Sequence, residues 1–574
     1  MAKFLIGVLT GIILTGLLAV IVIFALVRTG EKRPTVAEGS TLILRIEGPV
    51  PEQAPVEFPI PFLEQQTPLT VADYWDLLRK AAVDSRIKAV VVEPRGVGAG
   101  WAKLQEIRNC LVEFRKSGKP LFVYLKAPGT REYYLATAAD RIYIAPEEWL
   151  NVKGVRAELM YFRKTLDKIG VQAEIVHAGK YKDFGDTFTR TNMSEETREV
   201  MNSVLDEVYL HLVETLAKGR KKSAEQIRSA IDQGPFLAEQ ALRLGLVDGL
   251  IYEDQMFDEL KKRLNAKEIK KLSCRDYVKV PSSGLNLEGK QRIALLIGEG
   301  DILRGGGGDG MGADGEIYSD GFSKLLRQVG DERLVKGVVV RINSPGGDSV
   351  ASDEIWREMK LLSKKKPVVI SMSDAAASGG YYISMTGDPV LAYPGTFTGS
   401  VGVVFGKINL RGLYDKLGIT KDLLVRGKFA DIDSDYRSLT DEERRKLREG
   451  IDDNYKTFVT RVAEGRKRKF EEIEPLAQGR VWLGTQAMRH GLVDELGGLD
   501  RAIELVKQKA RIPRSEKVRL LTYPPRRNIL DLIFSRATEG LAESRARQVL
   551  EKLHVKVWSP GGMLRLMPFT VEIQ

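Results

Sequence analysis

The chain has 574 residues, of which 43% are hydrophobic and 29% charged, a composition that suits a packed body and excludes a chain disordered throughout. Its formal net charge of +11 fits either nucleic acid or an anionic membrane surface. It has no zinc-finger, RNA-recognition or basic-zipper motif, so we expect no nucleic-acid partner.

Cysteine and histidine are sparse. Cys110 and Cys274 form no CxxC motif, so we expect two buried, unpaired thiols, with a single disulfide as the alternative. The four histidines form no HExxH motif, which argues against a zinc protease. We therefore expect neither a metal nor a cofactor.

Residues 1–40 are interpreted as a membrane anchor. Residues 4–27 carry no charge and are almost all apolar. As a helix they would rise about 36 Å, enough to cross a hydrocarbon core of ~30 Å. The run is longer than the apolar core of a cleaved signal and no clear A-x-A site follows it, which favours an uncleaved anchor. Positive charge is heavier on its C-terminal side, at Arg28, Lys32 and Arg33, and this alone favours a cytoplasmic body.

The rest of the chain contains an internal repeat with an offset of 248 residues. The offset relates Lys88–Val92 to Lys336–Val340, Tyr133 to Tyr381, and Gly179 to Gly427. Matches at one constant offset indicate two copies of a single unit. We place the copies at 41–265 and 291–510, joined by a connector at 266–290 and followed by a basic tail at 511–574 with a helix around 528–553.

Short β-branched runs alternate with helical periods in both copies. The sequence predicts strands at 89–92, 121–124, 337–342 and 368–371, and helices at 101–116 and 351–365. Longer helices are expected to close the copies at 194–216 and 440–463, after Ser194 and Thr440. The alternation predicts an α/β fold in which each copy is a mainly parallel sheet covered by helices.

Three glycine-rich motifs of the second copy are candidates for chemistry. Asn343–Gly347 follows a hydrophobic strand, and its consecutive glycines would expose backbone amides to an oxyanion. Thr398–Val403 places Ser400 between a glycine and a valine at a strand end, which suits an exposed nucleophile. Ala375–Tyr382 places Ser378 among small residues at an expected helix start.

The two copies have kept complementary halves of one site. Lys182 of the first copy aligns with Ala430 of the second, whereas Ser400 aligns with Val152. We therefore expect a composite site of Lys182 with Ser400, and an inactive reciprocal pair. A serine hydroxyl needs a neighbouring base, and burial lowers a lysine pKa toward neutrality. No histidine matches a triad partner, so the pattern favours a Ser–Lys dyad.

Together these motifs, in a duplicated chain behind an anchor, resemble the long form of the signal peptide peptidase A (SppA) family. The resemblance implies two tandem Clp/crotonase-like units, with Ser400 as nucleophile, Lys182 as general base, and amides of Gly346 and Gly347 as the oxyanion hole. It also implies a homotetramer in the bacterial cytoplasmic membrane that degrades remnant signal peptides and other extended apolar peptides. The implied body is extracytoplasmic, and we adopt this orientation over the one that the flanking charges favour.

Three alternatives remain open from the sequence. Ser378 lies in the motif that resembles the Clp-type nucleophile, although the stretch Asp388–Thr396 lacks the histidine that Clp-like enzymes pair with that serine. A catalytically silent scaffold would keep the fold with its dyad misplaced. A crotonase-type acyl-CoA enzyme would use the same fold on a thioester.

Overall fold

The computed structural model describes residues 35–55, 67–306, 315–526 and 563–567, together with positions 7, 11, 14 and 15. The helix expected at 4–27 lies almost entirely outside these residues, and the helix expected around 528–553 lies wholly outside them. Within the described ranges, no helix combines the length and the apolarity needed to cross a membrane.

The first copy is built on a parallel sheet with the strand order β8-β4-β3-β2-β1-β9. Its strands are β1 (Ser40–Pro49), β2 (Ile87–Gly98), β3 (Leu121–Leu125), β4 (Arg141–Ile144), β8 (Gly249–Leu250) and β9 (Lys270–Ser273). Two short strands, β5 (Trp149–Leu150) and β7 (Phe236–Leu237), pair separately. The predicted strands 89–92 and 121–124 are confirmed, and their residues are buried because helices cover the sheet.

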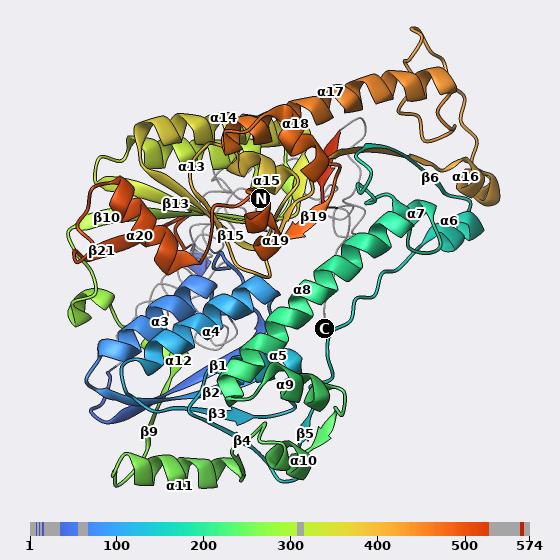
Figure 1. Cartoon of the computed structure of the whole chain (residues 1–574). Helices are drawn as coiled ribbons and strands as arrows, with labels where there is room; N and C mark the ends of the chain where they lie inside the picture. Colours follow the sequence, from blue (N-terminus) through green and yellow to red (C-terminus); the bar gives the residue numbers. More distant parts are fainter. Residues whose placement is uncertain are drawn as a thin grey trace.

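The helices of the first copy follow its strands in alternation (Figure 1). They are α3 (Val71–Val83), α4 (Trp101–Arg115), α5 (Thr130–Ala136), α6 (Arg163–Ile169), α7 (Asp186–Thr189), α8 (Glu195–Arg220), α9 (Ala224–Ile231), α10 (Ala238–Arg243), α11 (Glu253–Arg263) and α12 (Cys274–Tyr277). The predicted start of α8 is confirmed, because the side chain of Ser194 accepts a hydrogen bond from the amide of Thr197. Cys110 and Cys274 are free and buried, as expected.

The second copy repeats this plan with the strand order β19-β17-β15-β13-β10-β21. Its strands are β10 (Gln291–Glu299), β13 (Val335–Ser344), β15 (Val368–Ala377), β16 (Val390–Ala392), β17 (Phe397–Gly399), β19 (Val481–Leu483), β20 (Glu495–Leu496) and β21 (Val518–Tyr523). All pairs are parallel except β17 with β19. The α/β fold with mainly parallel sheets is thus confirmed, and the predicted strands 337–342 and 368–371 lie in β13 and β15.

The helices of the second copy are α13 (Ser319–Asp331), α14 (Ser349–Lys365), α15 (Gly379–Ser384), α16 (Arg411–Leu417), α17 (Asp441–Arg466), α18 (Phe470–Ile473), α19 (Gly484–Arg489) and α20 (Leu499–Lys509). Helix α17 begins where the sequence predicted, because Thr440 and Glu443 form a reciprocal capping box. The described parts of the expected connector and tail include strands that were not predicted. Strand β9 of the connector joins β1, and β21 of the tail joins β10, because each covers an open sheet edge.

A third sheet joins the two copies, with the order β12-β11-β14-β22-β18-β6. It contains β6 (Gln172–Ala178) of the first copy and β18 (Val403–Asn409) of the second, paired antiparallel. The other strands are β11 (Ile302–Leu303), β12 (Ile317–Tyr318), β14 (Gly346–Asp348) and β22 (Leu564–Leu566). Figure 1 shows α8 running from the first copy up to α7, below β6, and β6 in turn contacts α17 of the second copy.

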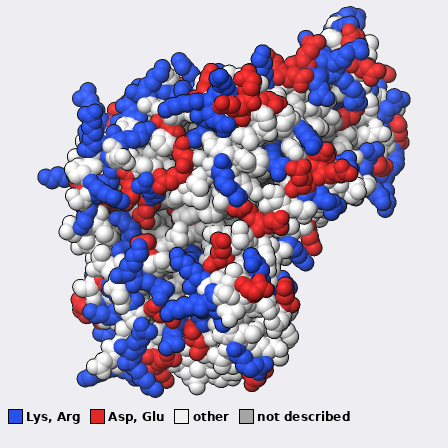
Figure 2. All heavy atoms as spheres, in the orientation of Figure 1, with Lys and Arg blue, Asp and Glu red and all other residues white. Residues whose placement is uncertain are grey.

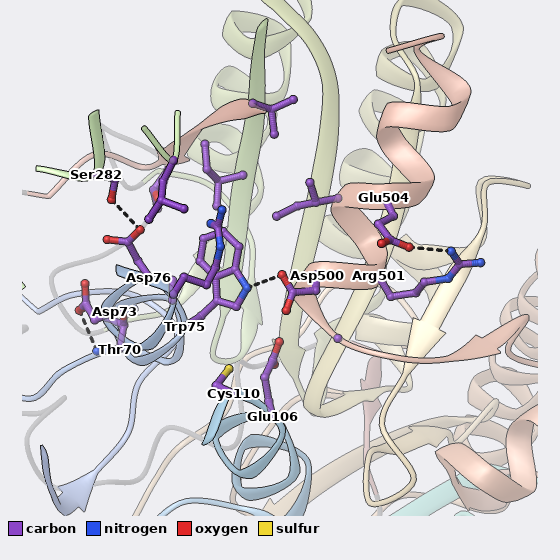
Figure 3. Close-up of a pocket in the computed structure, with 18 of the residues that line it drawn as sticks. Thr70, Asp73, Trp75, Asp76, Glu106, Cys110, Ser282, Asp500, Arg501 and Glu504 are labelled. Atoms are coloured by element: carbon purple, nitrogen blue, oxygen red, sulfur yellow. Dashed lines mark hydrogen bonds and ion pairs between the residues drawn. The ribbon is translucent and has the colours of Figure 1, made fainter. Parts of the chain in front are cut away.

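The copies also meet across a buried ionic cluster. Arg341 of β13 donates hydrogen bonds to Glu52 at 2.8 Å and to Glu106 at 2.5 Å, and all three side chains are almost wholly buried. A cavity of about 1040 Å³ lies nearby, where Trp75 of α3 donates to Asp500 of α20 (Figure 3).

Figure 2 shows acidic and basic side chains interspersed over the described surface of this face, on both the upper and the lower part of the molecule.

Candidate active site

Strands β6 and β18 bring Lys182 of the first copy into the second copy. Their ladder ends at Ala178 opposite Val403, so the chain leaves β6 directly beside Ser400. The next turn is fixed by hydrogen bonds from the amide of Tyr181 to Gln478 O and from the amide of Gly479 to Val401 O. A Cβ on Gly479 would lie 2.6 Å from the Cβ of Lys182, so only glycine leaves room for the lysine there.

The amine of Lys182 contacts two serines. Its Nζ lies 2.8 Å from Ser378 Oγ and 2.9 Å from Ser400 Oγ, and it donates to the carbonyl oxygen of Ser400 at 2.9 Å. All three side chains are fully buried. The predicted juxtaposition of Lys182 with Ser400 is therefore present, and Ser378 joins it at the same distance. Distance to the amine does not by itself select the nucleophile.

Burial controls the charge of Lys182. Its complete burial holds the pKa of Lys182 well below the usual range, because a charged amine there has lost its hydration. The neighbouring carboxylate of Asp183 opposes this shift, and the guanidinium of Arg565 adds to it. Burial also raises the pKa of Asp183 to about 6, while Thr197 donates a hydrogen bond to its carboxylate. This direction favours the neutral form of the amine, which is the form that can act as a base.

Backbone context distinguishes the two serines. Ser378 stands between β15 and α15 with φ 52° and ψ −113°, a sharp turn of the kind that exposes a nucleophile between a strand and a helix. Its amide is tied to Gly399 O at 2.8 Å. Ser400 also has φ 52°, but it follows the end of β17, where three residues of β17 pair with β19, and its amide donates to Arg480 O.

Backbone amides for an oxyanion lie beside Ser378. A Cβ on Gly379 would lie 3.1 Å from the amide nitrogen of Gly347, so the amides of these two glycines are close neighbours. The amide of Gly346 is engaged, because it donates to Ser344 Oγ at 3.2 Å. Of the two glycines expected in the oxyanion hole, Gly347 has the suitable amide. Gly346 supplies space at a φ of 115°, and the neighbouring amide of Gly379 was not singled out from the sequence.

A segment of the chain's own tail lies between β14 and β18 as an extended strand, and the space that it occupies is called the groove below. Strand β22 pairs antiparallel with β14 and also contacts β18, with Arg565 opposite Gly347. The amide of Met567 donates to Pro345 O, and the amide of Ser349 donates to Met563 O. A Cβ on Gly346 would lie 1.9 Å from the carbonyl oxygen of Arg565 and 2.8 Å from the amide nitrogen of Gly379. A peptide carbonyl thus lies at the two amides beside Ser378.

The equivalent position of the first copy is closed. Thr130 stands at the place of Ser378, and Glu132 fills the neighbouring space. The carboxylate of Glu132 accepts hydrogen bonds from the amides of Val97 and Gly129, at 2.7 and 2.9 Å. These amides are therefore occupied by the protein itself. Val152, at the place of Ser400, is buried in the core of the first copy.

Comparison with known proteins assigns the family. The model of peptidase family S49 matches residues 113–267 and 360–513, once in each copy. The chain belongs to peptidase family S49. Serine protease SPPA, chloroplastic, from Arabidopsis thaliana is 35% identical over 492 residues, which cover 85% of this chain and 71% of that protein. Protease 4 of Salmonella typhi is 31% identical over 482 residues, with 81% and 76% covered.

Membership of family S49 makes the chain a serine peptidase of the SppA type. It also removes the acyl-CoA enzyme from the alternatives. Among solved structures, ClpP1 from Listeria monocytogenes is similar to 36% of this chain and 91% of its own, at 18% identity and a TM-score of 0.22. A score that low is no measure of a shared fold, so the Clp/crotonase-like description of each unit stays a prediction.

Proposed function

We propose that the chain is a serine endopeptidase that uses a composite dyad, with Lys182 as general base and Ser378 as nucleophile. The observation that carries the proposal is the buried amine of Lys182, 2.8 Å from a serine hydroxyl that adjoins two backbone amides. Ser400, the nucleophile expected from the sequence, is here assigned to holding that amine. The silent-scaffold alternative is disfavoured, because its premise is a misplaced dyad.

The valence of a neutral amine supports this division of roles. A neutral amine has two hydrogens and one lone pair. The carbonyl oxygen of Ser400 only accepts, so one hydrogen of Lys182 points to it. If the second hydrogen goes to Ser400 Oγ, the lone pair is left for the hydroxyl of Ser378. The two contacts with Ser400 thus orient the base toward Ser378.

The chemistry follows from these positions. Ser378 Oγ attacks the peptide carbonyl carbon as its proton passes to Lys182 Nζ. The amides of Gly347 and Gly379 donate to the oxyanion that develops. The C–N bond then breaks, and the protonated amine of Lys182 gives its proton to the leaving nitrogen. Water repeats the sequence on the serine ester, which releases the acid and restores the hydroxyl.

Extended peptides are the substrates that this groove favours. A peptide placed like β22 would add a strand between β14 and β18, so backbone hydrogen bonds would bind it without regard to sequence. Remnant signal peptides, which join basic and apolar segments, have the required chemistry. With the apolar run at 4–27 as an anchor, we place the enzyme in the bacterial cytoplasmic membrane with its body on the extracytoplasmic side.

The repeat supports assembly into a closed homo-oligomer. At the offset of 248, β18 corresponds to residues 155–161 and β6 to residues 420–426. Within the described chain neither segment belongs to a strand, and they expose Met160 and Leu424, which are 73% and 94% accessible. Residues 155–161 of one molecule can pair with residues 420–426 of a neighbouring molecule. This pairing repeats the β6–β18 ladder between molecules, in a head-to-tail arrangement. Head-to-tail contacts form a ring when the rotation between neighbours closes, which is what the expected homotetramer requires.

Alanine variants of the full chain test the dyad on a quenched extended peptide. Ser378→Ala and Lys182→Ala are expected to lose activity by at least about 10⁴-fold and 10²-fold respectively. Peptidase activity that persists in Ser378→Ala and disappears in Ser400→Ala would overturn the assignment of the nucleophile. Activity that persists in Lys182→Ala would overturn the dyad.

A further inference from the structure

Arg565 of the bound tail segment fills a pocket beside the reacting centre. The side chain is 1% exposed, although it belongs to a short strand whose neighbours Leu564 and Leu566 are only partly buried. The guanidinium carbon lies 3.8 Å from the ring centre of Tyr382 and 5.2 Å from that of Phe458. Aromatic faces at these distances attract a cation.

The same pocket offers acceptors to the guanidinium. Nη1 of Arg565 donates to the carbonyl oxygen of Ser349 at 3.1 Å, and Nη2 contacts Asn454 Oδ1 at 3.5 Å. Burial lowers the pKa of Arg565, and the nearby Tyr382 and the carboxylates of Asp353 and Asp348 oppose that shift. An apolar side chain at this position would make neither contact, whereas a basic one can donate to these oxygens.

The position of Arg565 along the groove gives this pocket a role in specificity. The carbonyl oxygen of Arg565 is the one that approaches Gly346 and the amide of Gly379, as described above. The side chain on the acyl side of the attacked bond therefore enters the pocket. We infer that the pocket of Tyr382, Phe458, Ser349 O and Asn454 selects a basic residue at that position, and that Arg565 occupies it in the manner of a substrate. This inference rests on the proposed function.

The inference refines the class of substrate. Met563–Met567 reads Met-Leu-Arg-Leu-Met, a single basic residue among apolar ones. The apolar neighbours lie along β14 and β18, and the basic residue points into the pocket. An extended peptide in which an arginine or lysine borders an apolar run meets both requirements, as the junction of the charged and apolar regions of a signal peptide does.

Peptides that differ at one position test the inference. Three quenched peptides based on Met-Leu-Xaa-Leu-Met carry arginine, citrulline or leucine at Xaa, since citrulline keeps the shape of arginine without its charge. The enzyme is the full chain with Arg565→Ala, which empties the pocket, and Arg565→Lys is the control that keeps it filled. We expect kcat/KM for arginine to exceed that for citrulline and leucine by about 10- to 100-fold.

Two further results are expected. KM for the arginine peptide should be lower in Arg565→Ala than in Arg565→Lys, because the internal competitor is gone. Asn454→Leu, placed in the Arg565→Ala chain, should reduce the preference for arginine. Equal or better cleavage of the leucine peptide, with Ser378 still labelled by an acylating probe, would overturn the pocket assignment alone. Absence of both peptide cleavage and labelling would overturn the proposed function, and the inference with it.

Discussion

The loss of peptidase activity in Ser400→Ala shows whether Ser400 or Ser378 is the nucleophile, because the two assignments predict losses of very different size. In the account above this hydroxyl makes one of three polar contacts of the Lys182 amine, and the carbonyl oxygen of Ser400 keeps another. Ser400→Ala therefore removes one hydrogen bond, worth about 0.5–1.5 kcal/mol, which corresponds to a loss of about 2- to 10-fold in rate. Looser positioning of the amine extends the expected loss to about 100-fold.

The assay is kcat/KM on an extended peptide, measured for the parent chain, Ser400→Ala and Ser378→Ala. The loss in Ser400→Ala should fall on kcat with little change in KM, because the serine does not touch the peptide in this account. Ser378→Ala should retain no more than about 10⁻⁴ of the parent activity. A loss in Ser400→Ala as large as that in Ser378→Ala would refute the reasoning.

Three further predictions follow from the site and the joint between the copies. Gly347→Ala should lower kcat by at least about 100-fold, because the added Cβ would lie 2.0 Å from Ile302 O. Gly330→Ala in α13 is the control, and it should leave kcat unchanged because no atom lies closer than 3.5 Å to the added Cβ. Asp183→Asn removes a charge that raises the pKa of Lys182, so the acid limb of the kcat/KM profile should move to lower pH; a shift to higher pH would contradict this. Arg341→Met should lower the free energy of unfolding by about 3–5 kcal/mol at pH 7, and by less as the pH falls and its buried partner carboxylates become protonated; chemical denaturation at two pH values measures both.

The repeat could be predicted from the sequence because duplicated segments keep matching residues at a constant offset. The contact of Lys182 with the second copy could be predicted for the same reason. A lysine with no serine in one copy, and serines with no lysine in the other, make sense only if the copies join. The structure supplies the joint as the β6–β18 ladder, which local patterns do not reveal because it pairs segments more than 200 residues apart.

The choice between Ser378 and Ser400 was harder from the sequence, since both lie beside glycines. Alignment of the copies favoured Ser400, because valine replaces it in the first copy. The backbone amides around Ser378 come from two separate segments, at Gly347 and Gly379, and only the folded chain brings them together. The absence of a histidine that could serve as base for Ser378 also argued against that serine. In the structure, Lys182 of the first copy lies where such a base would be needed.

The tail segment was missed for a related reason. The sequence indicated an apolar end at Met563, but nothing local marks it as the occupant of a groove. Its strand forms only against β14 and β18, and the burial of Arg565 depends on aromatic residues of α15 and α17. Interactions of this kind follow from tertiary context rather than from periodicity.

Identification of the acylated serine tests the central claim most directly. The full chain is treated with an acylating peptide ester that deacylates slowly, and the adduct is located by mass spectrometry. Residues 367–406 contain no lysine or arginine, so trypsin leaves both serines in one peptide, and fragmentation or chymotrypsin must separate them. The account predicts an adduct on Ser378 that persists in Ser400→Ala and forms far more slowly in Lys182→Ala. An adduct on Ser400 would contradict it.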